Sequence, residues 1–545
     1  MHRNQSVSTH HFSMIPRADI PRSSFNIEST HKTTFDAGYL VPIYCDEVLP
    51  GDSMALSMTA FCRLSTPLFP IMDNLHLDSF FFFVPNRLIW DNWVKFMGEQ
   101  RNPGDSISFT IPQVVSAANG FVVGSIYDYF GLPTVGQVTA ASTVSVNALP
   151  LRAYNLCYRE WFRDENLINS PTVATNDGPD PLANYALLKR GKRHDYFTSS
   201  LPWPQKGATA VSLPLGTSAT VKTAGSNLFT GAQTGMQVLR ATGATTAANV
   251  LTAANAGAFY ESTGAATGNS GGLYPSNLYA DLSTATAATI NQLRQSFQIQ
   301  KLLERDARGG TRYTEIIRAH FGVMSPDARL DRPEYLGGGS SPIVISPIAQ
   351  TSATGLTGGS TPVGNLAAVG TAVQNRHGFS YSATEHGYII GLLNVRADLT
   401  YQQGLRKLWS RSTRYDFYFP AFAMLGEQAV LNKEIYCTGT PGDGLDNNAF
   451  GYAERWAEYR YMPSQITGLF RSTSAGTIDP WHLAQRFSAR PTLNQTFIEE
   501  SPPLSRILAV GAAANGQQII CDTFFKLRAA RPMPTYSVPG LIDHF

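Results

Sequence analysis

The sequence predicts a mainly β protein, one barrel or sandwich with long insertions that carry a few helices. Three observations predict it. Segments near both ends of the 545-residue chain show the strand period of two and are bounded by turn residues. Charged residues make up only 15%, against about 25% in an average soluble protein, whereas Gly (46) and Pro (33) are abundant. Amphipathic helical patterns are few. This balance favours short strands joined by loops, and large buried contacts with other chains.

The strand signal is clearest in the first 115 residues. It predicts strands over Lys32–Val41, Ser53–Ser65 and Leu75–Val84. Within Ser53–Phe61 the larger apolar side chains fall two apart, which indicates one buried face. The run Phe80–Val84 is apolar throughout and has the length of a strand, so we expect burial on both faces. The later predicted strands are 388–399, 415–422, 454–462 and 517–526.

Two helices are expected. After Pro150 the apolar residues fall at helical spacing, at Tyr154, Cys157, Tyr158, Trp161 and Phe162. A second helix is predicted from about 284 to 308, where Gly309-Gly310 ends it.

Two stretches nearly free of charge separate the predicted elements. From Gly207 to Ala280 the only charged residues are Lys222, Arg240 and Glu261, and residues 337–375 carry none. The simplest interpretation is a flexible linker, because few large apolar groups are present to offset the entropy of ordering the chain. The first stretch nevertheless keeps large apolar residues, which favours an excursion that becomes ordered against neighbouring copies. These residues are Leu228, Phe229, Val238, Leu239, Phe259, Tyr260, Leu273 and Tyr274.

The charge, the cysteines and the hydrophobic runs of the sequence argue against several classes of protein: strongly basic nucleic-acid binders, secreted proteins and membrane-spanning proteins. A net charge of +2 creates no strong field towards nucleic acid or anionic membranes. The five cysteines lack CxxC spacing, so we expect reduced, mostly buried thiols in a protein made in a cytoplasm; one or two disulfides are the alternative. The polar N-terminus lacks a signal peptide's apolar stretch, and no run is long enough to cross a membrane. Residues 1–30 are expected to form an extended arm.

Sequence motifs for catalysis and for cofactors are absent. No phosphate-binding GxxxxGK[ST], dinucleotide-binding GxGxxG, HExxH or nucleophile elbow occurs, so we expect neither enzyme activity nor a cofactor. Cysteine and histidine spacing is not that of a zinc site. The acidic turn 442–448 offers oxygen ligands for calcium but lacks the ordered ligand pattern of a calcium loop, so a plain turn is the preferred interpretation.

Basic clusters are the remaining candidate sites. The first contains Lys189, Arg190, Lys192 and Arg193, with Trp203 nearby. Basic groups interleaved with aromatic ones can hold a single nucleic-acid strand through phosphate contacts and base stacking. The alternative is a solvated face or a set of salt-bridge partners, because acidic residues lie alongside. Two further clusters are Arg305, Arg308 and Arg312, and Arg406, Lys407, Arg411 and Arg414.

A series of motifs runs in order along nearly the whole chain. They are HKTTFDAG (31–38), DEVLPGD (46–52), TPLFPIMDN (66–74), FFVPNR (82–87), RAYN (152–155), KRGKRHDYFT (189–198), LPWPQKG (201–207), QIQKLLER (298–305), RADLTYQQG (396–404) and ERWAEYRY (454–461). In these motifs the chain resembles the major capsid proteins of the gokushoviruses, a subfamily of the Microviridae.

The resemblance implies an eight-stranded antiparallel viral jelly-roll barrel with long insertion loops carrying several helices. It implies one capsid domain over residues 31–545, in a T=1 shell of about 60 copies around a circular single-stranded DNA genome. Residues 207–286 correspond to a variable surface insertion near the threefold axes, thought to meet the host. No receptor site is carried over, so Phe229, Phe259, Tyr260 and Tyr274 are only candidate attachment residues.

The resemblance also implies partners and a location. The partners are other copies of the chain, a small basic DNA-packaging protein, a minor pilot protein, the genome and a bacterial surface receptor. The protein would belong to the virion and assemble in the host bacterial cytoplasm. About 60 copies at +2 supply roughly 120 positive charges against thousands of phosphates, so other basic protein or counter-ions must neutralise the genome.

Two other function classes remain as alternatives. A carbohydrate-binding adhesin would use the Thr-, Ser- and Asn-rich loops, and deletion of 207–286 would remove its only function. A hydrolase on a β scaffold would need a nucleophile, a base and an orienting group together, which no part of the sequence supplies.

Overall fold

The computed structural model describes most of the chain outside the charge-poor insertion. The described residues are 21–207, 290–310, 312–323, 331–351, 363–510 and 517–536, with the backbone of six short strands between 220 and 281. The chain divides into two compact units, residues 205–306 and the remainder. None of the described helices is long and apolar enough to cross a membrane.

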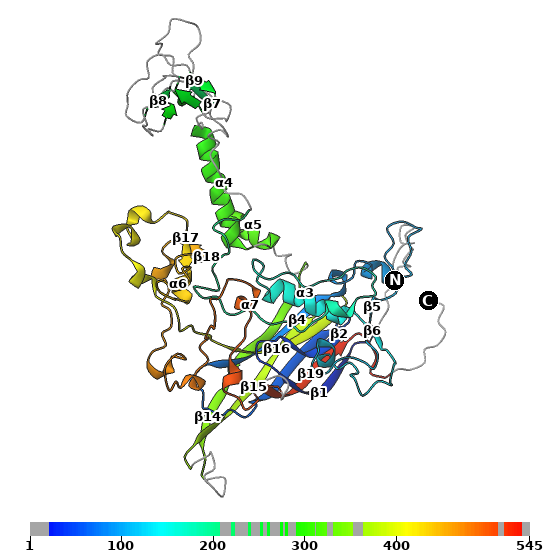
Figure 1. Ribbon diagram of the computed structural model, residues 1–545. Coiled ribbons are helices and arrows are strands. Elements are labelled where there is room, and N and C mark those ends of the chain that lie inside the picture. Colours follow the sequence, from blue (N-terminus) through cyan, green and yellow to red (C-terminus); the bar gives the residue numbers. More distant parts are fainter. Residues whose placement is uncertain are drawn as a thin grey trace, which may run out of the picture. The chain divides into compact units, whose positions relative to one another are not determined.

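Two antiparallel sheets form a β-sandwich in the larger unit, as Figure 1 shows. The five-stranded sheet runs in the order β1 (Ser23–Phe35), β19 (Ile519–Arg531), β3 (Ser53–Leu64), β15 (Leu366–Ser382) and β14 (Val344–Ala349). The four-stranded sheet runs in the order β13 (Glu334–Pro342), β4 (Leu75–Pro85), β16 (Gly387–Ala397) and β2 (Val41–Val48). The prediction of a mainly β protein is confirmed.

The strands pair in a nested order along the chain. β1 pairs with β19, β2 with β16, β3 with β15 and β4 with β13. The first strand therefore meets the last, the second meets the next to last, and so on inwards. Only Ile343 separates β13 from β14, which belongs to the other sheet, so the chain changes sheets at that residue.

The core follows the predicted periodicity. β3 buries alternate residues from Met54 to Leu64, while Phe61 on its other face is 49% exposed. In β4, Phe81 and Phe83 enter the core between the sheets, whereas Phe82 and Val84 pack on the far side against a second cluster. The predicted burial of the Phe80–Val84 run on both faces is therefore confirmed for residues 81–84. β16 lies between β4 and β2 and is buried along its whole length.

Helix α3 (Leu149–Cys157) covers the outer side of the four-stranded sheet (Figure 1). It continues into a π-helical turn over Tyr158–Phe162, so the helix predicted after Pro150 is confirmed. The predicted helix at 284–308 is confirmed as α4 (Ile290–Gly309) for its described residues. Residues 284–289 lie outside the described part. The other helices are α1 (Trp93–Phe96), α2 (Ile126–Tyr129), α5 (Tyr313–Phe321), α6 (Asn432–Ile435) and α7 (Gln495–Ile498).

Short hairpins account for the other strand pairs of the described residues. In the larger unit β5 (Gln113–Val115) pairs with β6 (Ser145–Asn147), and β17 (Glu427–Leu431) with β18 (Ala449–Glu454). In the unit 205–306 the pairs are β7 with β12, β8 with β11 and β9 with β10. Their bounds are Thr220–Thr223, Leu278–Asp281, Val238–Arg240, Leu273–Pro275, Leu251–Ala253 and Phe259–Glu261.

Three predicted strands were wrong in whole or in part. Residues 32–41 were predicted as one strand, but they contain the end of β1, a turn at Ala37–Gly38 and the first residue of β2. Residues 415–422 form two single-turn 3-10 helices, and within 454–462 the strand β18 ends at Glu454 and a 3-10 turn follows over Ala457–Tyr459. Most of the large apolar residues there are aromatic rings that pack edge to face on one another, and arginines lie over some of them, as Arg411 does over Tyr459 at 4.4 Å. Pro420 also lacks the N–H group that a strand ladder needs.

The interpretation of residues 337–375 as a flexible linker was also wrong for the residues that the structure describes. These residues contribute to β13, β14 and β15. Packing requires a glycine at Gly338, which has φ +152°, because a Cβ there would lie 2.0 Å from the carbonyl oxygen of Ser79. A segment of low side-chain volume is here a close-packed strand.

All five cysteines are free. Cys62, Cys157 and Cys521 are buried, whereas Cys45 and Cys437 are exposed. Three of the five thiols are therefore buried, as predicted, and Cys62 Sγ lies 2.7 Å from Cys521 Sγ on the neighbouring strand.

Candidate nucleic-acid interface

The segment with the first basic cluster, residues 189–194, lies between the loop at Gly38 and the loop at 498–500 and is hydrogen-bonded to both. Its backbone donates from Arg190 N to the Gly38 oxygen (2.9 Å) and from Lys192 N to the Ile498 oxygen (2.8 Å). Glu500 N donates in return to the Arg190 oxygen at 2.7 Å. Three distant parts of the sequence therefore meet at this segment.

Arg190 is held by a carboxylate of the four-stranded sheet. Its Nη1 lies 2.5 Å from Oδ2 of Asp78 on β4, and its guanidinium lies 4.9 Å from the centre of the Phe80 ring. The same Asp78 oxygen accepts from Arg396 Nε on β16 at 2.7 Å, and both Asp78 and Arg396 are buried. Burial alone would raise the pKa of Asp78, but the Ser340 hydroxyl and the two guanidinium groups hold it below its usual value. The ion pair between Arg190 and Asp78 thus holds the basic segment 189–194 against the four-stranded sheet.

Lys192 and Glu500 form the buried end of the cluster. Lys192 Nζ donates to Gln485 Oε1 at 3.0 Å and lies 4.3 Å from the centre of the Phe497 ring. Burial lowers the pKa of Lys192 to about 8. The Glu500 carboxylate accepts from Ala397 N at 3.2 Å, and burial raises the pKa of Glu500 to about 7.

Replacing Glu500 by glutamine is expected to remove a pH dependence of stability. Because the pKa is raised from 4.5 to about 7 on folding, the folded state keeps a proton that the unfolded chain releases. The stabilisation is complete below pH 4.5 and is lost as pH rises through about 7, a difference of about 3 kcal/mol. Urea unfolding at pH 4.5 to 8 should show this fall in the native chain and a flatter profile in E500Q. The exposed-site control E28Q should keep the native slope, and a native slope in E500Q would contradict the assignment.

The other members of the cluster differ in exposure. Lys189 Nζ donates to Ser501 Oγ at 2.9 Å and lies 5.2 Å from the centre of the Tyr39 ring. Arg193 is 63% exposed, and its Nη1 lies 3.2 Å from Asp398 Oδ1. Trp203 has a buried indole N–H without a described partner. It does not line the cavity beside the basic segment, so the predicted pairing of Trp203 with the cluster is not formed in this cavity.

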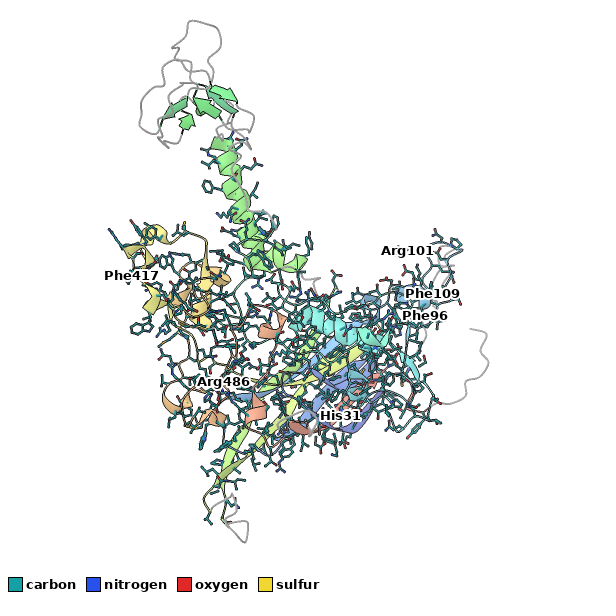
Figure 2. The ribbon with its side chains drawn as sticks, viewed as in Figure 1. His31, Phe96, Arg101, Phe109, Phe417 and Arg486 are labelled. Atoms are coloured by element: carbon teal, nitrogen blue, oxygen red, sulfur yellow. The ribbon has the colours of Figure 1, made fainter. Side chains whose placement is uncertain are left out.

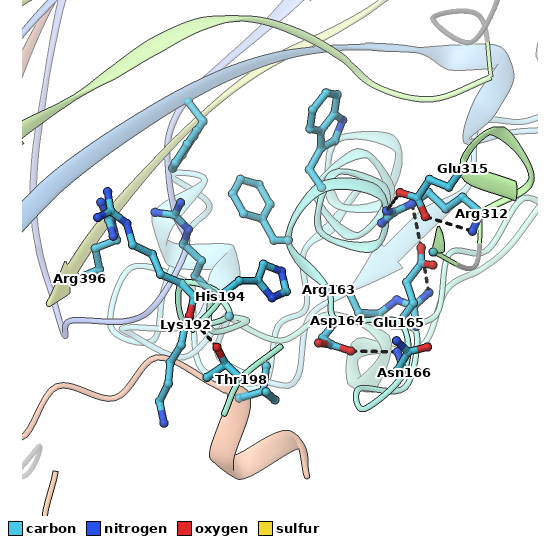
Figure 3. Close-up of a pocket in the computed structure, with 18 of the residues that line it drawn as sticks. Arg163, Asp164, Glu165, Asn166, Lys192, His194, Thr198, Arg312, Glu315 and Arg396 are labelled. Carbon is cyan, nitrogen blue, oxygen red and sulfur yellow. Dashed lines mark hydrogen bonds and ion pairs between the residues drawn. The ribbon is translucent and has the colours of Figure 1, made fainter. Parts of the chain in front are cut away.

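A cavity of about 620 Å³ opens beside the segment (Figure 3). The aromatic wall of this cavity does not include Trp203, the aromatic residue predicted from the sequence. It is formed by Phe80, Phe82, Trp161, Phe162 and Tyr335. Trp161 and Tyr335 are 38% and 43% exposed, and the centres of both rings lie within 6.1 Å of each other. The helical period had predicted Trp161 and Phe162 as part of a buried face, and no local signal connected them with residues 189–194.

The basic side chains around this cavity are largely paired. Arg312 lies 2.8 Å from Glu165, 2.9 Å from Glu315 and 3.3 Å from Glu160. Figure 3 shows His194 and Lys192 on one side of the cavity, and Arg312 with Glu315 on the other. An aromatic wall with cations at its edge can stack a base and contact a phosphate. Among the four predicted basic residues, Arg193 presents the most exposed charge.

The other basic clusters are also engaged internally. Arg308 forms ion pairs with Glu427 and Glu454. Arg411 pairs with Glu458 at 3.3 Å, and Lys407 with Glu434 at 3.5 Å. Arg305 and Arg414 are exposed, and Arg414 lies 5.3 Å from the Phe419 ring centre.

The acidic turn 442–448 is closed by a cation of the chain itself. Arg490 Nη2 lies 2.6 Å from Asp443 Oδ1 and 2.7 Å from Asp446 Oδ1. Burial would raise the pKa of Asp446, but Arg490 and the N–H groups of Thr438 and Gly439 lower it strongly. No group of three or more potential metal ligands occurs among the described residues.

The predicted attachment residues are described only in part. Phe259 and Tyr260 lie in β10 and Tyr274 in β11, as backbone, and Phe229 lies outside the described residues.

The described fold is an antiparallel β-sandwich with long connecting loops, and the arginines around its candidate site are largely bound in internal ion pairs. Residues 13–541 match the model of the family described as capsid protein (F protein), and the chain belongs to this family. It is 48% identical to capsid protein VP1 of Bdellovibrio phage phiMH2K over 98% of both chains. Identity is 42% with capsid protein VP1 of Chlamydia phage 1 and 37% with that of Spiroplasma virus 4, again over 98% of each chain.

The family and these names confirm the resemblance to gokushovirus capsid proteins. They indicate a structural protein of the virion that assembles with itself, and not an enzyme.

Proposed function

We propose that this chain is the major coat protein of a T=1 icosahedral shell, in which about 60 copies enclose a circular single-stranded DNA genome. The nested strand pairing carries the proposal together with family membership. β1, β2, β3, β4, β13, β15, β16 and β19 give eight strands in two four-stranded layers, and β14 extends one of them. This order supports an eight-stranded viral jelly roll whose first strand begins at Ser23, a wall element that buries its strands and leaves its loops for contacts between copies.

The proposed domain has an arm at its N-terminal end and an insertion within it. Residues 23–30 of the predicted arm are part of β1 and pair with β19, so the part of the arm outside the sandwich would be residues 1–22. Residues 207–286 form the proposed surface insertion at the threefold axes. The shell would assemble in the bacterial cytoplasm with a pilot protein.

Genome contact is proposed to be shared with a small basic packaging protein. The charge balance of +2 for each copy supports this, and so does the internal pairing of Arg190 with Asp78. Lys189, Arg190, Lys192 and Arg193 form the contact region, and Arg193 supplies its most accessible charge.

Replacing Arg193 by glutamine should weaken the binding of single-stranded DNA to unassembled subunits. Each lost phosphate contact lowers the slope of log K against log salt by about 0.7 for a single strand. R193Q should therefore show a smaller slope in a titration at several salt concentrations. R101Q removes another exposed arginine, 81% exposed in a separate loop, and should leave the slope unchanged. Equal slopes for R193Q and the native chain would refute the contact.

Deleting residues 207–286 should separate assembly from attachment. The sandwich strands lie outside this range, so particles are expected to form. Their adsorption to host cells, measured by counting unbound particles after mixing, should fall to background. Particles that still attach would contradict the attachment role, and a chain that loses every measurable function would favour an adhesin.

A further inference from the structure

Two sides of the larger unit expose apolar side chains that the fold itself does not cover. The aromatic flank consists of residues 406–425 and 455–471. The aliphatic flank consists of residues 91–147. Figure 2 shows Phe417 of the first and Arg101 and Phe109 of the second on opposite sides of the sandwich.

The aromatic flank is held together by its own contacts. Tyr418 packs on Tyr459 and on Trp456, with ring centres 6.4 and 5.6 Å apart, and Arg411 lies over both Phe417 and Tyr459. Its outer surface nevertheless exposes large side chains. Met424 is 99% exposed, Met462 76%, Trp409 72% and Tyr415 69%. Aromatic residues, Met and Arg are the types enriched in protein interfaces.

The aliphatic flank exposes smaller apolar groups on an ordered scaffold. Val122 and Val123 are each 67% exposed, Val135 54% and Met97 47%. Phe121 N donates to the Pro133 oxygen at 3.1 Å, and Val135 N to the Phe121 oxygen at 2.9 Å, so backbone bonds fix these valines in place. Exposed apolar surface on a rigid scaffold is characteristic of an interaction site.

The two flanks carry opposite charge. The aromatic flank contains seven basic and two acidic residues, a balance of +5. Two of the basic residues, Lys407 and Arg460, pair with Glu434 and Glu454 outside the flank, which leaves a balance of +3. The aliphatic flank contains four acidic and two basic residues, a balance of −2. Complementary charges favour contact between unlike flanks, and they disfavour the pairing of two aromatic flanks.

We propose that the aromatic flank of one copy packs against the aliphatic flank of the next copy. Such a head-to-tail contact between different surfaces closes into a ring when its rotation closes, as required around the symmetry axes of a shell. The occupant of each flank is thus a second copy of this chain. The inference rests on the proposed shell function and names the surfaces that build the shell.

Crosslinking of intact particles tests this contact. Cysteines are placed at Met424 and Val123 in a chain whose exposed native thiols are removed by C45S and C437S. Both sites are well exposed, so the substitutions leave the core intact. Particles are treated with a bismaleimide, denatured and separated by size. The double variant M424C/V123C should give a ladder of covalent oligomers, because each copy joins two different neighbours. M424C alone and V123C alone should remain monomeric.

Each outcome is decisive when particle formation is recorded separately by electron microscopy. A ladder in the double variant alone supports the proposal. Dimers from M424C alone would show that aromatic flanks meet one another, and they would overturn it. Intact particles whose double variant stays monomeric would also overturn it, while leaving the shell function standing. Absence of particles from the native chain would instead refute the proposed function.

Discussion

Replacing Arg152 by methionine is expected to cost about 3–5 kcal/mol of unfolding free energy, the range for breaking a buried ion pair. Arg152 on α3 is fully buried, and its guanidinium contacts both oxygens of Asp180 at 2.7 and 2.6 Å. It also donates to the carbonyl oxygens of Ile89 and Asn176. Asp180 in turn accepts from the Tyr185 hydroxyl at 2.5 Å. R152M leaves the Asp180 carboxylate buried without its cation.

Urea unfolding of the unassembled subunit measures this effect. R460M is the matched control, because Arg460 is 63% exposed and pairs with Glu454 at the surface; its cost should stay below about 1 kcal/mol. The double variant R152M/D180N should recover part of the loss, since it removes the unpaired charge. A loss of less than about 1 kcal/mol in R152M would show that this network does not hold α3 to the loops around it.

Replacing Asp78 by asparagine is expected to have an effect of similar size and to loosen the basic segment. One Asp78 oxygen holds Arg190 and Arg396, and Asp78 and Arg396 are each only 4% exposed. D78N leaves two guanidinium groups without their shared carboxylate, at a cost of about 3–5 kcal/mol. Hydrogen exchange should become faster at Arg190 and Lys192, whose N–H groups bond the neighbouring loops.

The matched control is D522N. Asp522 also lies on a strand and pairs with Lys32 at 2.5 Å, but these side chains are 50% and 71% exposed. D522N should cost less than about 1 kcal/mol. Equal losses for D78N and D522N would contradict the anchoring role of Asp78.

Periodicity and apolar runs predicted β3, β4, β16 and β19 because the burial of these four strands is regular or continuous. β3 and β19 bury alternate residues, and β16 is apolar enough to stand out although both its faces are covered. β15 was missed because Gly370 and Gly378 carry little side-chain signal, and yet a Cβ on Gly378 would meet the Leu56 oxygen at 1.9 Å. The position of such a strand depends on the neighbouring strand against which its glycines pack, and this neighbour is not visible in the local sequence.

The candidate site shows the limit of local patterns in another way. Lys189, Arg190, Lys192 and Arg193 were visible as a cluster, but their partners were not. Asp78 lies 112 residues from Arg190 and 318 from Arg396, so its pairing with both depends on the fold. The aromatic wall of the cavity likewise comes from β4, the π-helical turn after α3 and β13. Charge patterns in the sequence therefore located the segment without revealing how much of its charge is neutralised.

The most direct test of the shell function is a cryo-electron microscopy reconstruction of particles purified from cells that produce this chain. We expect sixty equivalent copies in a T=1 shell, with the two sheets of the sandwich in the wall and neighbouring copies joined through the aromatic and aliphatic flanks. A stable monomer that forms no particle under phage-producing conditions would contradict the account.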